Sequence, residues 1–128
     1  MRLETATIAI SLASLPFIVP HVGEDFAEGI AQRVGLSTGV GAFLLGGWLA
    51  LQSLGLVLLA WGRRPGWIIT FWVGLVWAVV AVVDHGPPIV RGSFRTGLPS
   101  VVWVLGLVIA QAAASALAWR GWRGARFR

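Results

Sequence analysis

The sequence predicts an all-α protein that forms a four-helix antiparallel transmembrane bundle. Hydrophobic residues make up 57% of the 128 residues and charged residues only 12%, roughly half the charged share of a soluble domain. The apolar residues form four runs, each close to the roughly 20 residues that a helix needs to cross about 30 Å of hydrocarbon. Strands are not expected, because the period-two alternation of a membrane barrel is missing. A single integral membrane domain is therefore predicted, with spans at about 5–22, 37–61, 66–83 and 98–119.

The first span is expected to face other helices and to bend at its outer end. It carries hydroxyl groups such as those of Ser11 and Ser14, which can bond across to a neighbouring helix or back to their own backbone. Pro16 and Pro20 each remove a backbone donor and tend to kink a helix. The chain is therefore expected to turn just before His21, as it reaches the membrane interface.

A short amphipathic helix is predicted at about 24–34, on the outer face. Apolar residues recur there at helical spacing and form one stripe, made of Phe26, Ala27, Ile30, Ala31 and Val34. A helix of this kind lies flat in the headgroup region.

The second span begins with a glycine-dense stretch, and small residues at such spacing let neighbouring helices approach closely. Tight packing is therefore expected at its outer half, around Gly35, Gly39, Gly41, Gly46 and Gly47. Gln52 in this span and Gln111 in the fourth should lie at similar depth, so a hydrogen bond between the two amides is predicted. An interhelical bond is favoured over a role of these amides in a transport path.

The arginines indicate the orientation of the bundle. The net charge is +5, with ten basic residues that are all arginine, and seven of them flank one end of the spans: Arg2, Arg63, Arg64, Arg120, Arg123, Arg126 and Arg128. The positive-inside rule then predicts a multi-pass protein of the cell membrane with both termini in the cytoplasm. The basic tail is expected to contact anionic lipid headgroups rather than nucleic acid. Disulfides and thiolate metal sites are excluded, because the chain has no cysteine.

The best functional clue is that every carboxylate except Glu4 lies in two segments, 21–33 and 84–95, which the spans place together on the outer face. Both histidines lie there too. An imidazole beside carboxylates can act as a general acid or base, or hold a metal, so the candidate catalytic residues are His21, Glu24, Asp25 and Asp84. The candidate ligand-binding residues are Glu28, His85, Arg91 and Arg95. If a metal binds, its ligands are expected among His21, Glu24 and His85, and the sequence identifies no cofactor.

Three interpretations of this outer cluster remain open. In the first, it is structural, and the outer arginines pair with the acids to join the two loops: Arg33, Arg91 and Arg95 with Glu24, Asp25, Glu28 and Asp84. In the second, these groups line a pocket for a small apolar or lipid-like ligand, with acid–base or metal chemistry as its catalytic form. In the third, the two histidines ligate one haem.

No catalytic motif of high specificity occurs in the sequence. The favoured hypothesis is the second, a small polytopic membrane protein with an outer-face polar pocket. The alternative hypothesis is a non-enzymatic packing subunit of a larger membrane complex, and the bis-histidine haem protein is a further alternative. The expected partners are membrane lipid, a small apolar or lipid-like ligand, and a second copy of the chain, because so small a bundle buries little interior.

Overall fold

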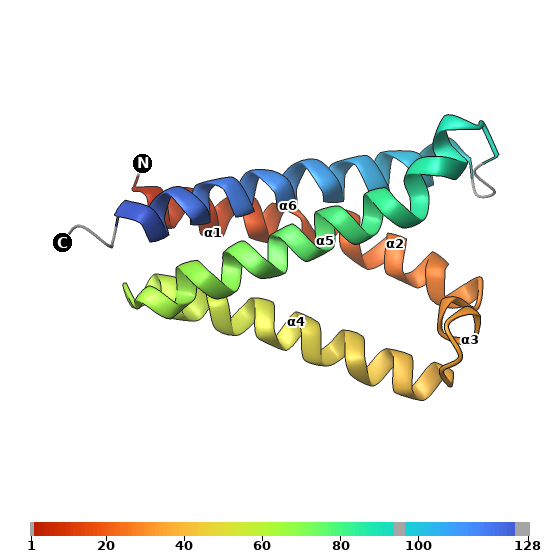
Figure 1. Cartoon of the computed structure of the whole chain (residues 1–128), viewed down its shortest axis with the longest axis horizontal. Coiled ribbons are helices and arrows are strands. Elements are labelled where there is room, and N and C mark those ends of the chain that lie inside the picture. The colour runs from red at the N-terminus through yellow and green to blue at the C-terminus, as the bar shows by residue number, and fades with distance from the viewer. Residues whose placement is uncertain (1, 94–96, 125–128) are drawn as a thin grey trace.

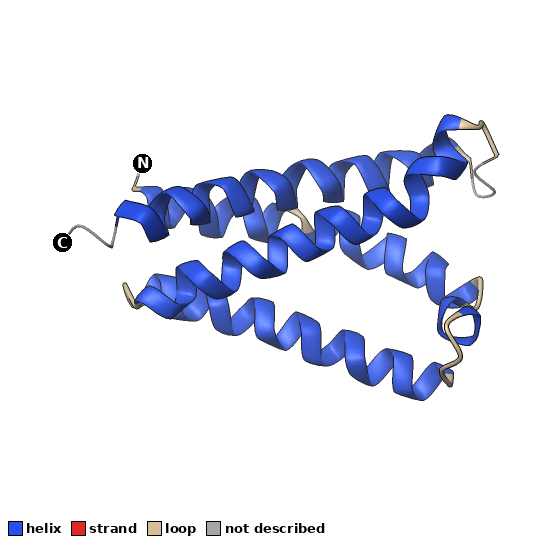
Figure 2. Ribbon diagram, viewed as in Figure 1, coloured by secondary structure: helices blue, strands red, loops and turns tan. Residues whose placement is uncertain are grey.

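The computed structural model describes residues 2–93 and 97–124 of the chain. Over these ranges the protein is helical and contains no strand (Figure 2). The helices are α1 (Leu3–Ala13), α2 (Leu15–Ala27), α3 (Ile30–Arg33), α4 (Thr38–Ala60), α5 (Arg64–Val90) and α6 (Leu98–Gly124). Four units, namely α1 with α2, α4, α5 and α6, are long and apolar enough to cross a membrane. At this level the predicted fold class is confirmed.

The two ends of the bundle differ in what they hold. Figure 1 shows the start of α1, the end of α6 and the turn between α4 and α5 at one end, which we call the terminal end. The short helix α3, the end of α5 and the start of α6 lie at the other, which we call the α3 end. Helix α6 contacts α1, α2 and α5, whereas α4 contacts α5 and, less extensively, α1 and α3. Helix α6 is therefore the central helix and α4 the peripheral one.

Local sequence signals set where the long helices begin. The Ser37 side chain caps α4 by accepting a hydrogen bond from the amide of Val40, at 3.2 Å. Pro65 occupies the first turn of α5, where its missing amide hydrogen costs no helical bond. Glycines with positive φ precede α5 and α6, with values of 65° at Gly62 and 82° at Gly97. Such left-handed backbone allows the chain to reverse between antiparallel helices.

The first membrane-length unit is interrupted at Ser14, between α1 and α2. Pro16 lies in the first turn of α2, and a proline ring clashes with the carbonyl four residues before it, so an uninterrupted helix is disfavoured there. Helix α2 then continues through Pro20 and past His21 to Ala27. The interruption therefore lies earlier in the chain than the turn before His21 that the prolines predicted.

The predicted amphipathic helix over 24–34 is not formed as one helix. Helix α2 ends at Ala27, and Gly29 has a φ of 75°, which ends a helix in the way typical of glycine. Only the single turn of α3 follows. Part of the apolar stripe packs on α4, because a Cβ added to Gly41 would lie 2.9 Å from the Cβ of Ala31 and 3.4 Å from the ring of Phe26.

The closest helix contacts lie away from the glycine-dense half of α4. A Cβ added to Gly74 of α5 would lie 2.8 Å from the carbonyl oxygen of Gln111 in α6, and one added to Gly121 would overlap the ring of Trp67. The prediction of tight packing along the outer half of α4 holds at Gly41, which lies against α3, and is wrong at Gly39, Gly46 and Gly47, where a Cβ would meet nothing within 4 Å. Helices α4 and α5 diverge toward the α3 end (Figure 1), so these glycines have no neighbouring helix to approach.

A layer of neutral polar side chains crosses the bundle near its middle. Gln52 Nε2 donates to Ser11 Oγ at 3.2 Å, and Gln111 Nε2 donates to Ser14 Oγ at 2.8 Å. Trp77 Nε1 donates to Gln52 Oε1 at 3.1 Å. We call these five residues the amide layer. The predicted bond between the two glutamines is wrong, because each amide donates to a serine of the first membrane-length unit instead.

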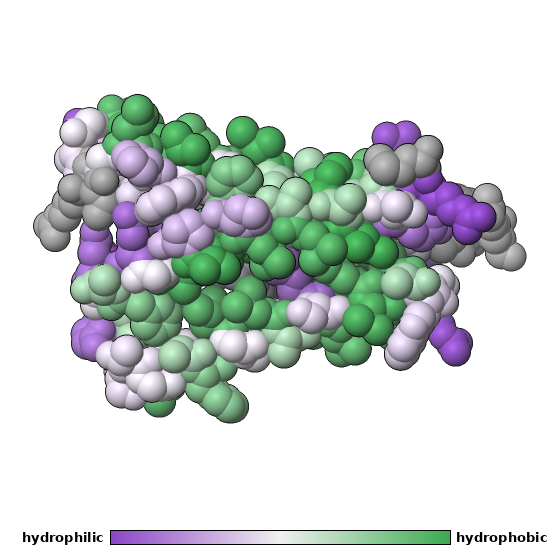
Figure 3. All heavy atoms as spheres, turned by 180° about the vertical axis from the view of Figure 1, so that it is seen from behind, coloured by the Kyte–Doolittle hydropathy of each residue, from purple (hydrophilic) through white to green (hydrophobic). Residues whose placement is uncertain are grey.

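Apolar side chains pack on both sides of the amide layer. The cluster toward the terminal end contains Leu56, Leu59, Trp67 and Ala118, and the cluster toward the α3 end contains Ile18, Ala81 and Leu107. The outer surface is also apolar over much of its middle, as Figure 3 shows for one face, while hydrophilic residues gather toward both ends. This distribution suits a protein surrounded by lipid.

Candidate functional site

The two histidines face each other across the α3 end, one on α2 and one on α5. His21 is 4% exposed and His85 is 9% exposed. Their rings meet edge to face, with centroids 4.5 Å apart and planes at 79°. The pair forms because α2 continues through Pro20 and α5 continues past residue 83 to Val90, so each histidine still belongs to a helix.

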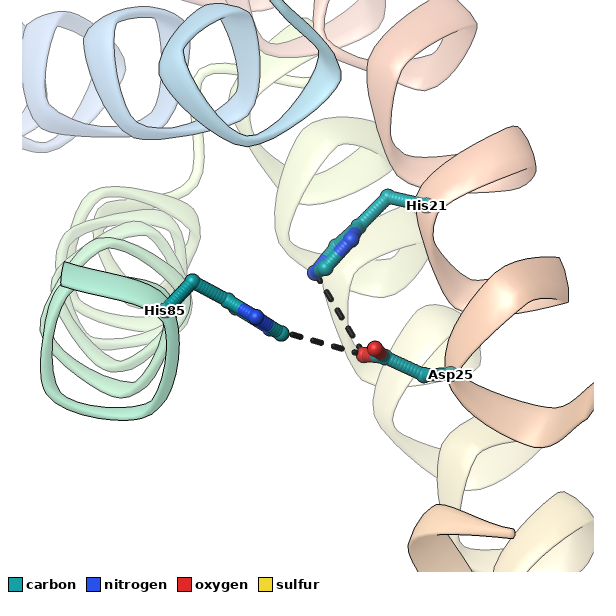
Figure 4. Close-up of side chains that lie close together, drawn as sticks. All are labelled: His21, Asp25 and His85. Atoms are coloured by element: carbon teal, nitrogen blue, oxygen red, sulfur yellow. Dashed lines mark ion pairs between the residues drawn. The ribbon is translucent and has the colours of Figure 1, made fainter. Parts of the chain in front are cut away.

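Asp25 joins the two histidines. It follows His21 by four residues on α2, so the two side chains share one helix face. One carboxylate oxygen, Oδ2, lies 3.4 Å from Nε2 of His21 and 3.7 Å from Nε2 of His85 (Figure 4). We call these three residues the His–Asp cluster. Two imidazoles and one carboxylate therefore converge on one point between α2 and α5.

The donor atoms of the His–Asp cluster have the spacing of metal ligands. One ligand atom from each of the three residues lies within 4.8 Å of the other two. Ligands placed about 2.0–2.1 Å from a zinc ion at tetrahedral angles lie about 3.4 Å apart. The observed separations of 3.4 and 3.7 Å are close to that value. Two histidines with one carboxylate is also a donor set of zinc enzymes and of non-haem iron sites.

Asp84 lies at the rim of the His–Asp cluster. Its Oδ2 is 3.3 Å from Nε2 of His85, and its side chain is 43% exposed, against 20% for Asp25. A carboxylate in this position can accept a proton. Asp84 is therefore close enough to His85 to exchange a proton with it, and exposed enough to exchange a proton with water.

Glu24 points away from the His–Asp cluster, toward α6. Its carboxylate oxygens lie 2.8 and 2.6 Å from Oγ of Ser100, which donates to them. Ser100 is fully buried. Successive residues on a helix point about 100° apart, since a turn takes 3.6 residues, so Glu24 and Asp25 contact different helices. Of the expected metal ligands, the cluster contains His21 and His85, and Asp25 in place of Glu24.

Two further candidate residues, Glu28 and Arg91, are not part of the cluster. Glu28 and Arg91 are exposed, and Arg95 lies outside the described residues. Within residues 2–93 and 97–124, no ion pair joins Arg33 or Arg91 to a carboxylate; the ion pairs there join histidine to aspartate. These two arginines therefore do not form the predicted network with the acids, and their side chains are exposed.

The contact between the histidine rings bears on the haem hypothesis. Two axial imidazoles hold a haem iron from opposite faces of the porphyrin, so the macrocycle must lie between them. The rings of His21 and His85 touch edge to face, with Asp25 at the same point. This arrangement has no room for a macrocycle, whereas a single metal ion needs only the space among the three donor atoms.

No protein-family model, curated protein or solved structure matches this chain. A helical bundle alone does not define a function, so the functional information in this chain lies in the chemistry of the site.

Proposed function

We propose that the protein is a small multi-pass membrane protein that binds one divalent transition metal ion, zinc by preference, through His21, Asp25 and His85. The single observation that carries this proposal is the convergence of these three donors, from two helices, within 4.8 Å. Buried ionisable groups within membrane helices are costly, so their presence favours a functional role. Zinc is preferred because it accepts nitrogen and oxygen ligands at tetrahedral spacing.

Three protein ligands leave one position of a tetrahedral metal for water or for a bound molecule. A metal in such a site acts as a Lewis acid on a carbonyl or phosphoryl oxygen, or activates a water molecule. Exposed apolar side chains of α5 lie just before His85 in the chain, Val82 at 52% and Val83 at 70% exposed, so we propose that the ligand is a small apolar or lipid-like molecule whose polar group approaches the metal. Asp84 is the residue best placed to accept a proton during catalysis.

We further propose that both termini are cytoplasmic and that α3 lies at the outer membrane interface, so that the His–Asp cluster is near the outer face. The support is the distribution of arginine: among the described residues, Arg2, Arg63, Arg64, Arg120 and Arg123 lie at the terminal end, against Arg33 and Arg91 at the other. Because the chain has no cysteine, single cysteines can report the topology. Ser93→Cys should react with an impermeant maleimide on intact cells, and Gly124→Cys should react only after lysis.

The alternative proposal, a packing subunit or homodimer, has one observation in its favour. The outer half of α4 presents open glycines and exposed apolar chains, including Phe43 at 80% exposed and Leu44 at 55%. Small residues of this kind allow close helix packing in a membrane. Native mass spectrometry in mild detergent tests it: a dimer that Gly46→Ile converts to a monomer would support this role for the face, and a wild-type monomer would oppose it.

The metal proposal is tested by elemental analysis and by titration of metal-free protein with zinc and cobalt. We expect one ion per chain, and a cobalt spectrum typical of tetrahedral nitrogen and oxygen ligands. His21→Ala and His85→Ala should each abolish stoichiometric binding. Glu28→Gln is the matched control, because it changes an exposed carboxylate on the same side of the bundle.

Two results would contradict the metal proposal. In the first, the wild-type protein binds no metal under any of these conditions. In the second, Glu28→Gln loses the metal as completely as His21→Ala, which would indicate general surface charge rather than a site. Thermal unfolding of each metal-free variant shows whether a loss of binding follows from a loss of fold.

A further inference from the structure

Two adjoining cavities lie at the terminal end, far along the bundle from the His–Asp cluster. The first has a volume of about 420 Å³, and its lining includes Arg2, Glu4, Trp67 and Arg120. The second has a volume of about 560 Å³ and shares Arg2 and Glu4 with the first. Both volumes fall within the range of about 300–1,000 Å³ that is typical of ligand pockets.

The first cavity is lined by charged side chains among apolar ones, and its net charge is positive. Two guanidinium groups, from Arg2 and Arg120, line it against the single carboxylate of Glu4. Within the described parts of the chain, no ion pair joins either arginine to a carboxylate. Both guanidinium groups can therefore bind an anion, and their planar geometry suits the oxygens of a phosphate.

The floor of the first cavity is fixed by packing between α5 and α6. The indole ring of Trp67, which is 6% exposed, lies against Gly121 so closely that a Cβ at residue 121 would overlap it. This contact holds the start of α5 against the end of α6, beside Arg120. The cavity thus belongs to a packed junction of helices.

The second cavity is apolar and runs along α1 beside the end of α4. Ile8 and Leu12 lie one helical turn apart on α1, and Leu59 lines the cavity from α4. Ala9 also lines it and is exposed, so the cavity is open to the membrane. A charged cavity that continues into an apolar one has the two-part chemistry of a membrane lipid, with a headgroup and an acyl chain.

We propose that these two cavities together bind one anionic phospholipid, with a headgroup such as that of phosphatidylglycerol, from the leaflet on the side of the termini. The phosphodiester lies between Arg2 and Arg120, and one acyl chain follows Ile8 and Leu12. One phosphate balances the single excess positive charge of the cavity. Glu4 can accept a hydrogen bond from a headgroup hydroxyl. This lipid site does not depend on the metal site.

The test is native mass spectrometry of the purified protein with equal amounts of phosphatidylglycerol, phosphatidylethanolamine and phosphatidylcholine. The wild-type protein should retain one phosphatidylglycerol in preference to the others. Arg120→Ala should weaken this retention about five-fold, as loss of one basic residue near a lipid headgroup predicts. Arg123→Ala is the matched control: it removes the same charge from the same helix, at a residue that does not line the cavity.

A second variant tests the apolar cavity without changing charge. Ala9→Phe places a ring in the groove from an exposed position, so it should reduce lipid retention while leaving the thermal stability of the lipid-free protein unchanged. Three results would overturn the proposal: equal losses in Arg120→Ala and Arg123→Ala, normal retention in Ala9→Phe, or preference for phosphatidylethanolamine that Glu4→Gln removes. The last would assign the site to a zwitterionic headgroup.

Discussion

The amide layer and the His–Asp cluster both bury polar groups between the helices, and they do so in different ways. In the amide layer, each donor nitrogen has its own acceptor, and every group is neutral. In the His–Asp cluster, two imidazoles converge on a single carboxylate oxygen. These neutral one-to-one bonds join the helices, so packing accounts for them. Convergence of ionisable donors on one point is what ion binding needs, and packing does not require it.

The largest expected difference between the two regions is their response to zinc. A ligand that binds only the folded state, at a hundred times its dissociation constant, stabilises a protein by about 2.7 kcal/mol. Zinc should therefore raise the free energy of unfolding of the wild-type protein. Asp25→Asn should lose this increment, because the amide is a poor metal ligand, whereas Gln52→Leu should keep it. Chemical unfolding in detergent, with and without zinc, measures both. An equal zinc increment in Asp25→Asn would remove Asp25 from the proposed ligand set.

Ser100→Ala sharpens the comparison within the α3 end itself. This change removes the hydroxyl that donates to Glu24, and a hydrogen bond to a charged group contributes about 2 kcal/mol. We expect a stability loss of about that size and an unchanged zinc affinity, because Glu24 points away from the cluster. Ser93→Ala, at an exposed serine, is the control. A large fall in zinc affinity in Ser100→Ala would show that Glu24 and the metal site act together.

Gln52→Leu tests the amide layer directly. It removes the hydrogen bonds to Ser11 and Trp77, so the free energy of unfolding should fall by about 1 kcal/mol, the usual size for interhelical bonds in a membrane. The loss should be the same with and without zinc. If the loss depended on zinc, the two regions would be coupled, and their separation into structural and functional groups would fail.

The smallest expected effect is that of Arg91→Ala. Arg91 is exposed and pairs with no carboxylate among the described residues, so neither stability nor zinc affinity should change measurably. The same two titrations measure it. A clear loss of either property would restore the hypothesis that arginines hold the outer loops together.

Much of this arrangement could be predicted from the sequence. The length of the apolar runs predicted the four membrane-length helices, and the positions of His21 and His85 relative to these runs placed both histidines at one end. Depth along a helix depends only on residue number, at about 1.5 Å per residue. A prediction of this kind does not require knowledge of how the helices are rotated.

The errors concern rotation and neighbours, which residue number does not determine. Gln52 and Gln111 do not bond each other, because their side chains point toward Ser11 and Ser14. Whether Asp25 or Glu24 faces His85 depends on the rotation of α2 about its own axis. Ser100 was missed because an isolated serine after a proline gives no distinctive signal. The open glycines of α4 show that small residues permit close packing but do not supply the partner helix.

Because α1 and α2 are separated at Ser14, the angle between these two helices determines where the far end of α2 lies. Two of the three proposed ligands lie on α2 and the third on α5, so the width of the gap between them depends on the angle of α2 about Ser14. Asp25 lies about 16 Å from that pivot along the helix, and a tilt of about one degree moves it by ~0.3 Å. Metal–ligand distances tolerate only about 0.2 Å. The hydrogen bond from Gln111 to Ser14 restrains the junction of α1 and α2. A contact in the bundle interior therefore helps to fix the distances between the three proposed metal ligands.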